Sequence, residues 1–137
     1  MKGMTLNEVM MVVIILAVTA SLAIPLYMRT AERARRDEAV AVLRMLRAAE
    51  RVYYLDDAPP QEYAPLTVLP PPGPLVSEGY LQNPNGDPNR AWDYDIVPNA
   101  DPGFDATATR RSGCNAGETL TIDEAGAEGG TWTLPCP

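Results

Sequence analysis

A run of twenty uncharged, mostly apolar residues near the N-terminus constrains the fold of this chain more than any other feature. It extends from Val9 to Met28 and consists largely of valine, isoleucine, leucine, methionine and alanine. At a rise of about 1.5 Å per residue, a helix of about 20 residues crosses a bilayer core about 30 Å thick. One carboxylate, Glu8, stands directly before the run, and Lys2 and Gly3 precede it. The sequence therefore predicts a membrane-spanning helix with a polar tip.

This run differs from the apolar region of a secretory signal peptide. Such a region has about 7–15 residues and is followed by a cleavage site of small residues. Here the only obvious processing signal, Gly3, lies before the apolar run. We therefore expect the helix to stay on the mature protein and any cut to fall after Gly3.

Gly3, Glu8 and Pro25 stand at characteristic distances from one another along this segment. In this spacing the chain resembles the type IV pilin family, which includes minor pilins and pseudopilins. In that family a prepilin peptidase cuts after the glycine, the new first residue is N-methylated, the fifth is a glutamate and the twenty-second is a proline. The resemblance implies cleavage after Gly3, methylation of Met4, and roles in assembly for Glu8 and Pro25. The chain departs from the family pattern in starting with Met4 instead of phenylalanine and in placing Asn7 before the glutamate.

Helical periodicity continues well beyond the apolar run. Residues 29–55 contain neither glycine nor proline, and mostly apolar residues recur at helical spacing. These residues are Ala39, Val42, Leu43, Leu46, Ala49 and Tyr53. We expect one helix of about 50 residues, about 75 Å long at 1.5 Å per residue. Its first half is apolar on all sides, and its second half is amphipathic.

The rest of the chain predicts a loop followed by a small sheet. Residues 58–90 are rich in proline, which favours an ordered connecting loop with a short helical turn at 77–81. Alternating patterns separated by glycine-containing turns predict strands at 91–97, 104–110, 118–123 and 131–134. A long helix packed on an antiparallel sheet of about four strands is an α+β fold, and the resemblance to type IV pilins implies the same arrangement.

These patterns divide the chain into five parts. Residues 1–3 form a leader peptide, residues 4–28 a transmembrane and polymerisation helix, and residues 29–56 the amphipathic half of that helix. Residues 57–90 form the Pro-rich connecting loop, and residues 91–137 form the sheet with a disulfide-closed C-terminal region.

The net charge of −7 is unevenly distributed along the chain. Beyond residue 51 the basic residues are Arg90, Arg110 and Arg111, whereas most of the acidic residues lie there. An acidic domain is a poor surface for nucleic-acid phosphates, so no direct nucleic-acid site is evident. The arginines at 29–36 directly follow the apolar run and could contact anionic lipid headgroups or form a solvated helix face.

The cysteines, Cys114 and Cys136, both lie in the last quarter of the chain. Outside the cytosol, a pair of cysteines predicts one disulfide. A metal pair or a redox pair fits less well, because the chain has no histidine and the spacing is not C-x-x-C. The resemblance agrees, since many pilins close their C-terminal region with a disulfide.

Familiar catalytic patterns are missing from the sequence. Without histidine, a Ser-His-Asp or Cys-His site is impossible, and there is no Walker-type phosphate loop. Residues 83–89 place oxygen-bearing side chains at alternate positions around Gly86, as calcium loops do, but the EF-hand pattern is not met and such residues also form turns. We expect no enzyme activity, no cofactor and no metal, with calcium at 83–89 left open.

Glu8 needs a partner once it leaves water. An unpaired carboxylate in hydrocarbon costs at least a few kcal/mol. In a membrane precursor Glu8 can remain hydrated at the interface, but a packed fibre core excludes that water. The ammonium group that cleavage would create on Met4, in the same chain or a neighbour, is the natural partner. Such a pair would penalise incorrect axial register.

Taken with the resemblance, these features predict a structural subunit of a type IV pilus used for adhesion, motility or DNA uptake. The subunit would enter the bacterial inner membrane, be cut by prepilin peptidase, and polymerise with itself through inner-membrane assembly machinery into an extracellular fibre. One alternative is a pseudopilin of a type II secretion system. Another is a membrane-anchored periplasmic binding module that never polymerises.

Overall fold

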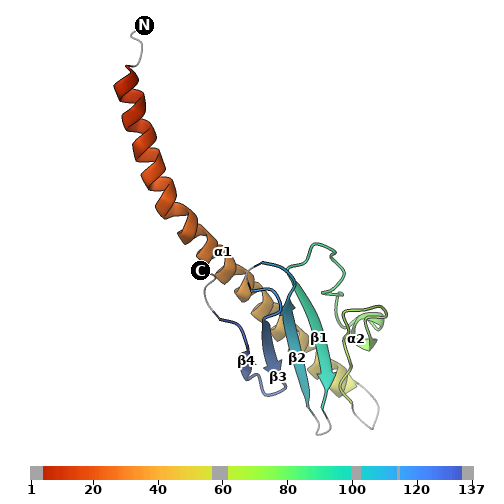
Figure 1. Cartoon of the computed structure of the whole chain (residues 1–137). Helices are drawn as coiled ribbons and strands as arrows, with labels where there is room; N and C mark the ends of the chain where they lie inside the picture. The colour runs from red at the N-terminus through yellow and green to blue at the C-terminus, as the bar shows by residue number, and fades with distance from the viewer. Residues whose placement is uncertain (1–4, 57–61, 100–102, 114, 134–137) are drawn as a thin grey trace. The chain divides into compact units, whose positions relative to one another are not determined.

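The computed structural model describes residues 5–56, 62–99, 103–113 and 115–133. The chain divides into two compact units, residues 1–34 and residues 35–137, and each is described by itself. We call residues 35–137 the head. Helix α1 (Leu6–Asp56) contributes to both units, and the other elements belong to the head (Figure 1). They are α2 (Pro74–Ser77), β1 (Trp92–Pro98), β2 (Phe104–Arg110), β3 (Thr119–Asp123) and β4 (Glu128–Gly130).

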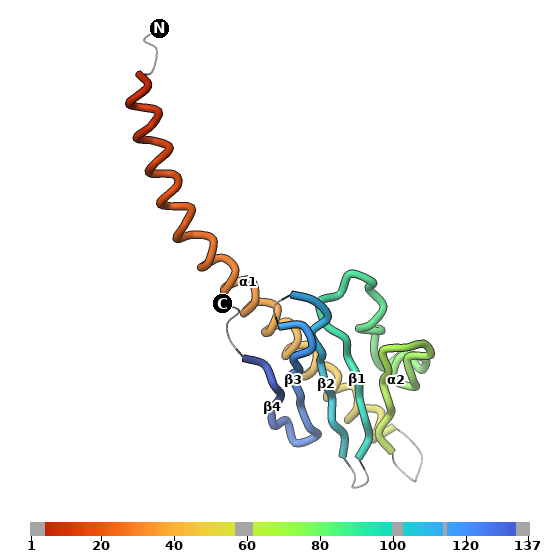
Figure 2. Tube along the Cα trace, in the orientation of Figure 1, coloured from red at the N-terminus to blue at the C-terminus, as the bar shows by residue number. Residues whose placement is uncertain are grey.

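The head contains a four-stranded antiparallel meander in the order β1-β2-β3-β4 (Figure 2). Side chains alternate between the two faces of each strand. In the central strand β2 the inward-facing residues between Phe104 and Arg110 are Ala106 and Ala108. They pair with larger residues on both sides, because Ala108 lies opposite Tyr94 and Leu120.

The head portion of α1 covers this inner face. Ala39, Leu43, Leu46 and Ala49 are buried, together with one charged residue, Glu50. They form a single hydrophobic core with the inward side chains of the sheet. The burial follows the i, i+3, i+4 pattern of a helix with one apolar face, so packing against the sheet stabilises this part of α1.

Between α1 and β1, the described residues 62–91 have little regular structure apart from α2. We call residues 62–73 the connector. Leu66 pairs with Ile96 through two backbone hydrogen bonds of 3.3 and 2.9 Å, which attach the connector to the free edge of β1. Gly73, before α2, has a φ of +94°, and a Cβ built there would lie 2.1 Å from the carbonyl oxygen of Pro65. Only glycine fits this position, because the backbone of the connector passes directly over it.

The predicted α+β class is confirmed, with a long N-terminal helix and a four-stranded antiparallel sheet. The predicted strand at 131–134 is wrong for its described residues. The final strand is β4, and Gly130 pairs with Leu120 although glycine has low strand propensity. After β4, the Trp132 ring turns to pack on Trp92 with ring centroids 5.4 Å apart. The backbone N–H groups of Thr131 and Trp132 both donate to the carbonyl oxygen of Thr119, at 2.9 and 3.2 Å, so the regular ladder ends there while the partly buried Trp132 ring packs on Trp92.

The helical turn predicted at 77–81 begins earlier than expected. The observed helix α2 covers Pro74–Ser77 and has Pro74 at its first position, where the fixed φ of proline suits a helix and its missing N–H has no consequence. Ser77 ends α2, and Gly79 has a positive φ of 87°.

Candidate functional site

The N-terminal part of α1 presents an apolar surface that nothing in its own unit covers. The most apolar stretch has a mean hydropathy of 2.7 and none of it is buried. The helix is long and apolar enough to cross a membrane by length and composition. Large side chains, among them Met11, Ile14, Leu16 and Leu22, are more than half exposed. A surface of this size needs lipid or protein around it, because soluble monomers rarely expose a contiguous apolar patch beyond a few hundred Å².

The hydroxyl groups within this apolar surface bond to their own helix. Thr19 donates to the carbonyl oxygens of Ile15 and Leu16 at 3.0 Å, and Ser21 donates to that of Val18 at 2.7 Å. These bonds satisfy the hydroxyl donors without an external partner. The segment can therefore enter an apolar environment although it is not purely hydrocarbon.

Glu8 forms a capping box with Thr5 at the start of α1. The backbone N–H of Thr5 lies 3.4 Å from Oε2 of Glu8, and the backbone N–H of Glu8 lies 3.4 Å from Oγ1 of Thr5. Each side chain thus offers an acceptor to a backbone N–H group at the start of the helix, and the N–H of Glu8 also donates to the carbonyl oxygen of Thr5 at 3.1 Å. The negative charge also suits the positive end of the helix dipole. Thr5 was not predicted as a site residue, although its T-x-x-E spacing before an apolar run is the sequence signature of this cap.

Pro25 lies inside α1, which continues through it. Proline has no N–H, so the carbonyl oxygen of Ser21 loses its usual donor four residues later. The other expected site residues, Gly3, Met4, Cys114 and Cys136, lie outside the described residues. Glu8 and Pro25 are therefore the expected site residues that the structure places, both on the N-terminal part of α1.

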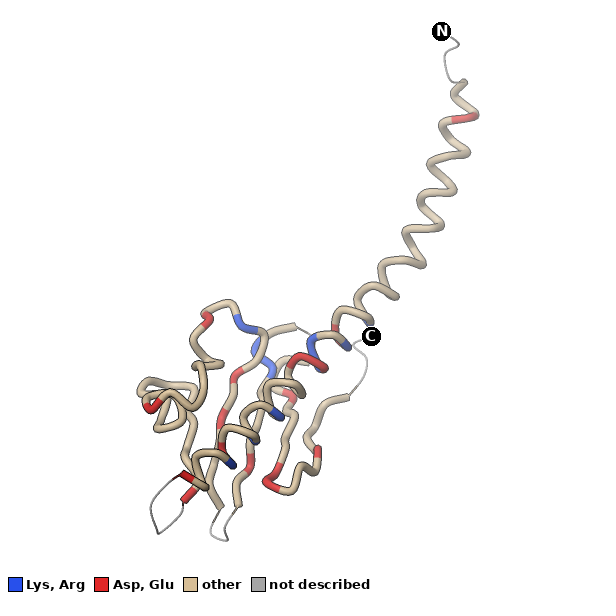
Figure 3. The backbone as a smooth tube through the Cα atoms, turned by 180° about the vertical axis from the view of Figure 1, so that it is seen from behind, with Lys and Arg blue, Asp and Glu red and all other residues tan. Residues whose placement is uncertain are grey.

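In the head, arginines of α1 hold the turn between β3 and β4. Arg47 donates from Nε to the carbonyl oxygen of Glu124 at 2.9 Å and from a terminal nitrogen to that of Ala125 at 2.7 Å. Arg51 reaches the carbonyl oxygen of Glu124 at 3.1 Å, and Arg44 pairs with the Glu128 carboxylate at 2.6 Å. Figure 3, which colours the backbone by residue type, shows basic positions along α1 and acidic positions in the strands and turns of the sheet.

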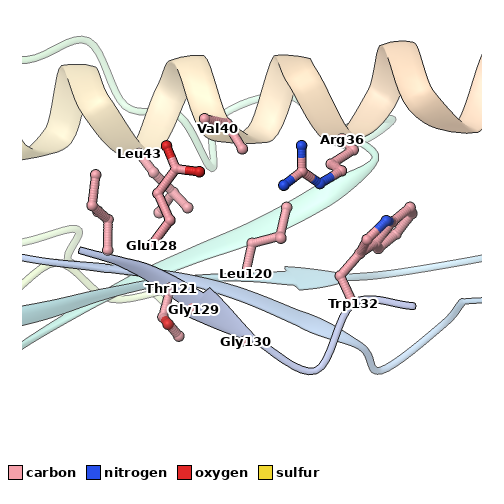
Figure 4. A pocket seen from close by; sticks show the side chains of 10 residues that line it. Arg36, Val40, Leu43, Leu120, Thr121, Glu128, Gly129, Gly130 and Trp132 are labelled. Carbon is pink, nitrogen blue, oxygen red and sulfur yellow. The ribbon is translucent and has the colours of Figure 1, made fainter. Parts of the chain in front are cut away.

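A groove of about 390 Å³ runs between α1 and the β3–β4 edge of the sheet (Figure 4). Its walls include Val40, Leu43 and Leu120, and Arg36 and Trp132 stand at one end. Within the described part of the chain, no group of three or more acidic residues, cysteines or histidines could hold a metal ion. The groove contains no arrangement typical of a catalytic site.

The segment considered for calcium uses its side-chain oxygens for internal hydrogen bonds. The Oδ1 atom of Asn85 accepts from the backbone N–H of Tyr94 at 2.9 Å, and its Nδ2 donates to the carbonyl oxygen of Tyr94 at 2.7 Å. Asn83 and Asp87 accept backbone N–H groups two residues further on, at 2.9 and 2.8 Å. The contacts of Asn83 and Asp87 are Asx turns within the segment, and the two hydrogen bonds of Asn85 fasten the segment to β1.

An uncovered apolar stripe lies on the outward side of α1 in the head. Its members follow one another at alternating intervals of four and three residues, which is the spacing of a coiled-coil seam. They are Ala41, Met45, Ala48, Val52 and Leu55, all exposed. We call these five residues the helix seam. Beside it is a shallow groove of about 370 Å³, bordered by Tyr80 and Leu81.

Comparison with known proteins gives two relatives. The chain is 36% identical over 106 residues to the type II secretion system core protein G of Pectobacterium carotovorum subsp. carotovorum, an alignment that covers 70% of this chain and 66% of that protein. It is 34% identical over 104 residues to the type II secretion system core protein G of Escherichia coli (strain K12), which covers 70% of each chain. No protein-family model matches the chain, and no solved structure matches it significantly.

Both relatives are named as core protein G of a type II secretion system. They correspond to the pseudopilin alternative better than to the pilus subunit that the sequence first suggested. The chain belongs to the pilin-like family of type II secretion system core protein G.

Proposed function

We propose that this protein is a pseudopilin, a structural subunit that polymerises through α1 into a short fibre of a type II secretion system. The observation that carries the proposal is the fully exposed apolar stretch of α1, in a chain related to core proteins of such systems. In the inner membrane, lipid would cover this stretch. In the fibre, helices of neighbouring subunits would cover it, and burial of apolar area would stabilise the polymer. The role is structural and not catalytic.

The helix seam would be the part of the assembly surface that the head supplies. From Ala41 to Leu55 it follows the helix for about 21 Å, at 1.5 Å per residue. Two of its five positions are alanines, which permit close approach of another helix. The seam carries no charge, so a second copy of the apolar helix could cover it without burying an ion.

Glu8 would control register at the tip of the helix. In the single chain its carboxylate caps the first turn together with Thr5. Cleavage after Gly3 would create an ammonium group on Met4, one residue before Thr5. In the fibre core that ammonium, in the same chain or a neighbour, would neutralise Glu8. A subunit in the wrong register would bury an unpaired charge.

Pro25 would assist the transfer from membrane to fibre. The carbonyl group that it leaves without a donor makes the surrounding turn easier to unwind. Local unwinding there would adjust the path of the apolar segment without disturbing the cap at Glu8.

The decisive experiment replaces the chromosomal gene by variants and follows both secretion and fibres. Loss of secretion of exported proteins, with no long surface fibres in the wild type, supports the pseudopilin. Long fibres whose main protein is this chain, seen by electron microscopy and mass spectrometry of sheared material, would instead identify a type IV pilus subunit. Mass spectrometry of the mature protein also tests for a methylated Met4.

Variants of the assembly surface test the mechanism. Val52→Glu places a charge on the helix seam and should abolish secretion of exported proteins while the head remains folded. Leu69→Glu is a matched control, because Leu69 is an exposed apolar residue of the connector, away from the seam. Glu8→Lys should leave a stable membrane protein that does not assemble. Normal secretion and normal fibres from both Val52→Glu and Glu8→Lys would contradict the proposed mode of assembly.

A further inference from the structure

Glu50 is an anomaly in the core of the head. It lies on the inward face of α1, and its side chain is 0% exposed among the apolar residues that join α1 to the sheet. A carboxylate in such a place needs several hydrogen bonds or a cation to remain ionised. Within the described part of the chain, one hydrogen bond to Glu50 is found. The backbone N–H of Ala64 donates to Oε2 at 3.0 Å, and Oε1 is buried with no hydrogen-bond partner among the described residues.

The nearby charged groups do not neutralise Glu50. Arg47 and Arg51 lie on the same helix, but their guanidinium groups donate to the carbonyl oxygens of the β3–β4 turn. Tyr63 precedes Ala64, so the groups that act electrostatically on its side chain indicate which charges lie near this end of the core. They are Tyr54 and Arg51 of α1, Glu124 of the turn and Glu50 itself. Burial raises the pKa of Glu50 to about 7, and the hydrogen bond from Ala64 counteracts only part of this effect.

The donor to Glu50 belongs to the connector, which covers this end of the core. Tyr63 stacks on Tyr54 of α1, with ring centroids 4.7 Å apart, and contacts Phe104 of β2 at 5.0 Å. Ala64 and Leu66 are almost completely buried. Residues 63–66 are therefore a lid over Glu50, attached to the helix by the carboxyl group and to the sheet by Leu66 and the tyrosine ring.

We propose that Glu50 is a proton-operated latch, whose neutral carboxyl group holds the connector at Ala64 against the head and whose ionised form releases it. The hydrogen bonds of the protonated and ionised carboxyl group explain why ionisation opens the latch. When the proton is present, Oε2 accepts from Ala64, and the hydroxyl group leaves one weakly unfavourable buried donor. When the proton is lost, a full negative charge faces apolar side chains with one backbone donor. The shortest route for that charge to water is outward movement of residues 63–66.

The latch therefore opens as pH rises, which is opposite to the behaviour of an ordinary salt-bridged carboxylate. With a pKa of about 7 in the closed head and the ordinary value of 4.5 in the open one, the opening constant should rise about tenfold between pH 6 and pH 8. This inference is independent of the proposed function, because it concerns the head alone.

Hydrogen exchange measures the latch directly. The full-length protein in detergent micelles is exchanged at pH 6, 7 and 8, and rates are converted to protection factors to remove the intrinsic pH dependence. A peptide covering residues 62–67 should lose protection about tenfold from pH 6 to pH 8. A peptide from β2 in the same sample, which exchanges only when the whole head unfolds, should remain more strongly protected than residues 62–67 at every pH. In Glu50→Gln, which retains an acceptor for Ala64 and cannot ionise, residues 62–67 should show no pH dependence.

Glu38→Gln is the matched control, since Glu38 is an exposed carboxylate on α1 and should leave the wild-type profile unchanged. Constant protection of residues 62–67 in the wild type would overturn the proposal. So would an unchanged pH profile in Glu50→Gln. If the glutamine variant fails to fold, the protection of residues 62–67 relative to that of β2 in the wild-type protein still tests the proposal. Equal protection factors in the two peptides at every pH would show that residues 62–67 open only by global unfolding, and would also reject the latch.

Discussion

Replacing Arg47 by alanine should weaken the attachment of the β3–β4 turn to α1. Arg47 donates to two backbone carbonyl oxygens of this turn, at 2.9 and 2.7 Å, and its side chain is half-buried. Gly126 has a φ of +93° and packs so closely on the guanidinium group that a Cβ there would lie 2.8 Å from it. The absence of a side chain at Gly126 therefore leaves room for the guanidinium group of Arg47.

The magnitude follows from the kind of contact. A hydrogen bond to a charged donor contributes about 1.5–3 kcal/mol when it is protected from water. The turn is partly exposed, so its carbonyl groups can regain water when the arginine is removed. We expect Arg47→Ala to lower the free energy of unfolding by about 2 kcal/mol in total. Arg44→Ala removes the exposed ion pair with Glu128 and should cost less than about 1 kcal/mol.

Thermal unfolding of the full-length protein in micelles tests this difference. Near-ultraviolet circular dichroism reports the contact between Trp92 and Trp132 in the head. For a folded unit of about 100 residues, each kcal/mol changes Tm by roughly 4–8 °C. Arg47→Ala should therefore lower Tm by roughly 8–16 °C, and Arg44→Ala by only a few degrees at most. Equal losses in the two variants would refute the distinction between backbone-directed and solvent-exposed arginine contacts.

Three further predictions concern the head. Leu46→Ala should cost about 2–5 kcal/mol because Leu46 is fully buried, whereas Met45→Ala next to it, on the exposed seam, should cost less than about 1 kcal/mol in urea unfolding. Because the pKa of Glu50 is raised to about 7 in the folded head, the folded state binds this proton more tightly than the unfolded state does. The stabilisation from the bound proton is complete below pH 4.5 and decreases by about 3 kcal/mol as pH rises through 7. Stability measured from pH 4.5 to pH 8 should therefore fall less in Glu50→Gln than in the wild type, and parallel curves would contradict the assignment. Finally, we predict a disulfide between Cys114 and Cys136, supported by the hydrogen bond of 2.8 Å from Asn115 to the carbonyl oxygen of Thr133. Alkylation with and without reduction, followed by mass spectrometry, should show two masked thiols, and two freely alkylated thiols in the exported protein would disprove it.

Local patterns predicted most of the elements, and the exceptions have physical causes. The strand at 104–110 was predicted with its observed bounds because its alternation is regular and one face is buried. The last strand was misplaced because Trp132 suggests a strand by propensity, whereas its ring is held by another aromatic ring far away in sequence. The capping role of Thr5 was visible in the spacing and was overlooked. The buried position of Glu50 was not visible, because a glutamate on an amphipathic helix ordinarily faces solvent.

The sequence by itself determined the apolar helix, its polar tip, the proline within it and the α+β class. These properties depend on neighbours along the chain, through hydrophobic periodicity, capping and turn chemistry, so they can be read without coordinates. The tertiary structure alone decided which residues of distant segments meet. It placed Ala64 over Glu50, the turn carbonyls on Arg47 and the two tryptophan rings together. Such contacts depend on the packing of α1 and the connector against the sheet. No local pattern encodes that packing. The same packing buries Glu50 and thereby raises its pKa.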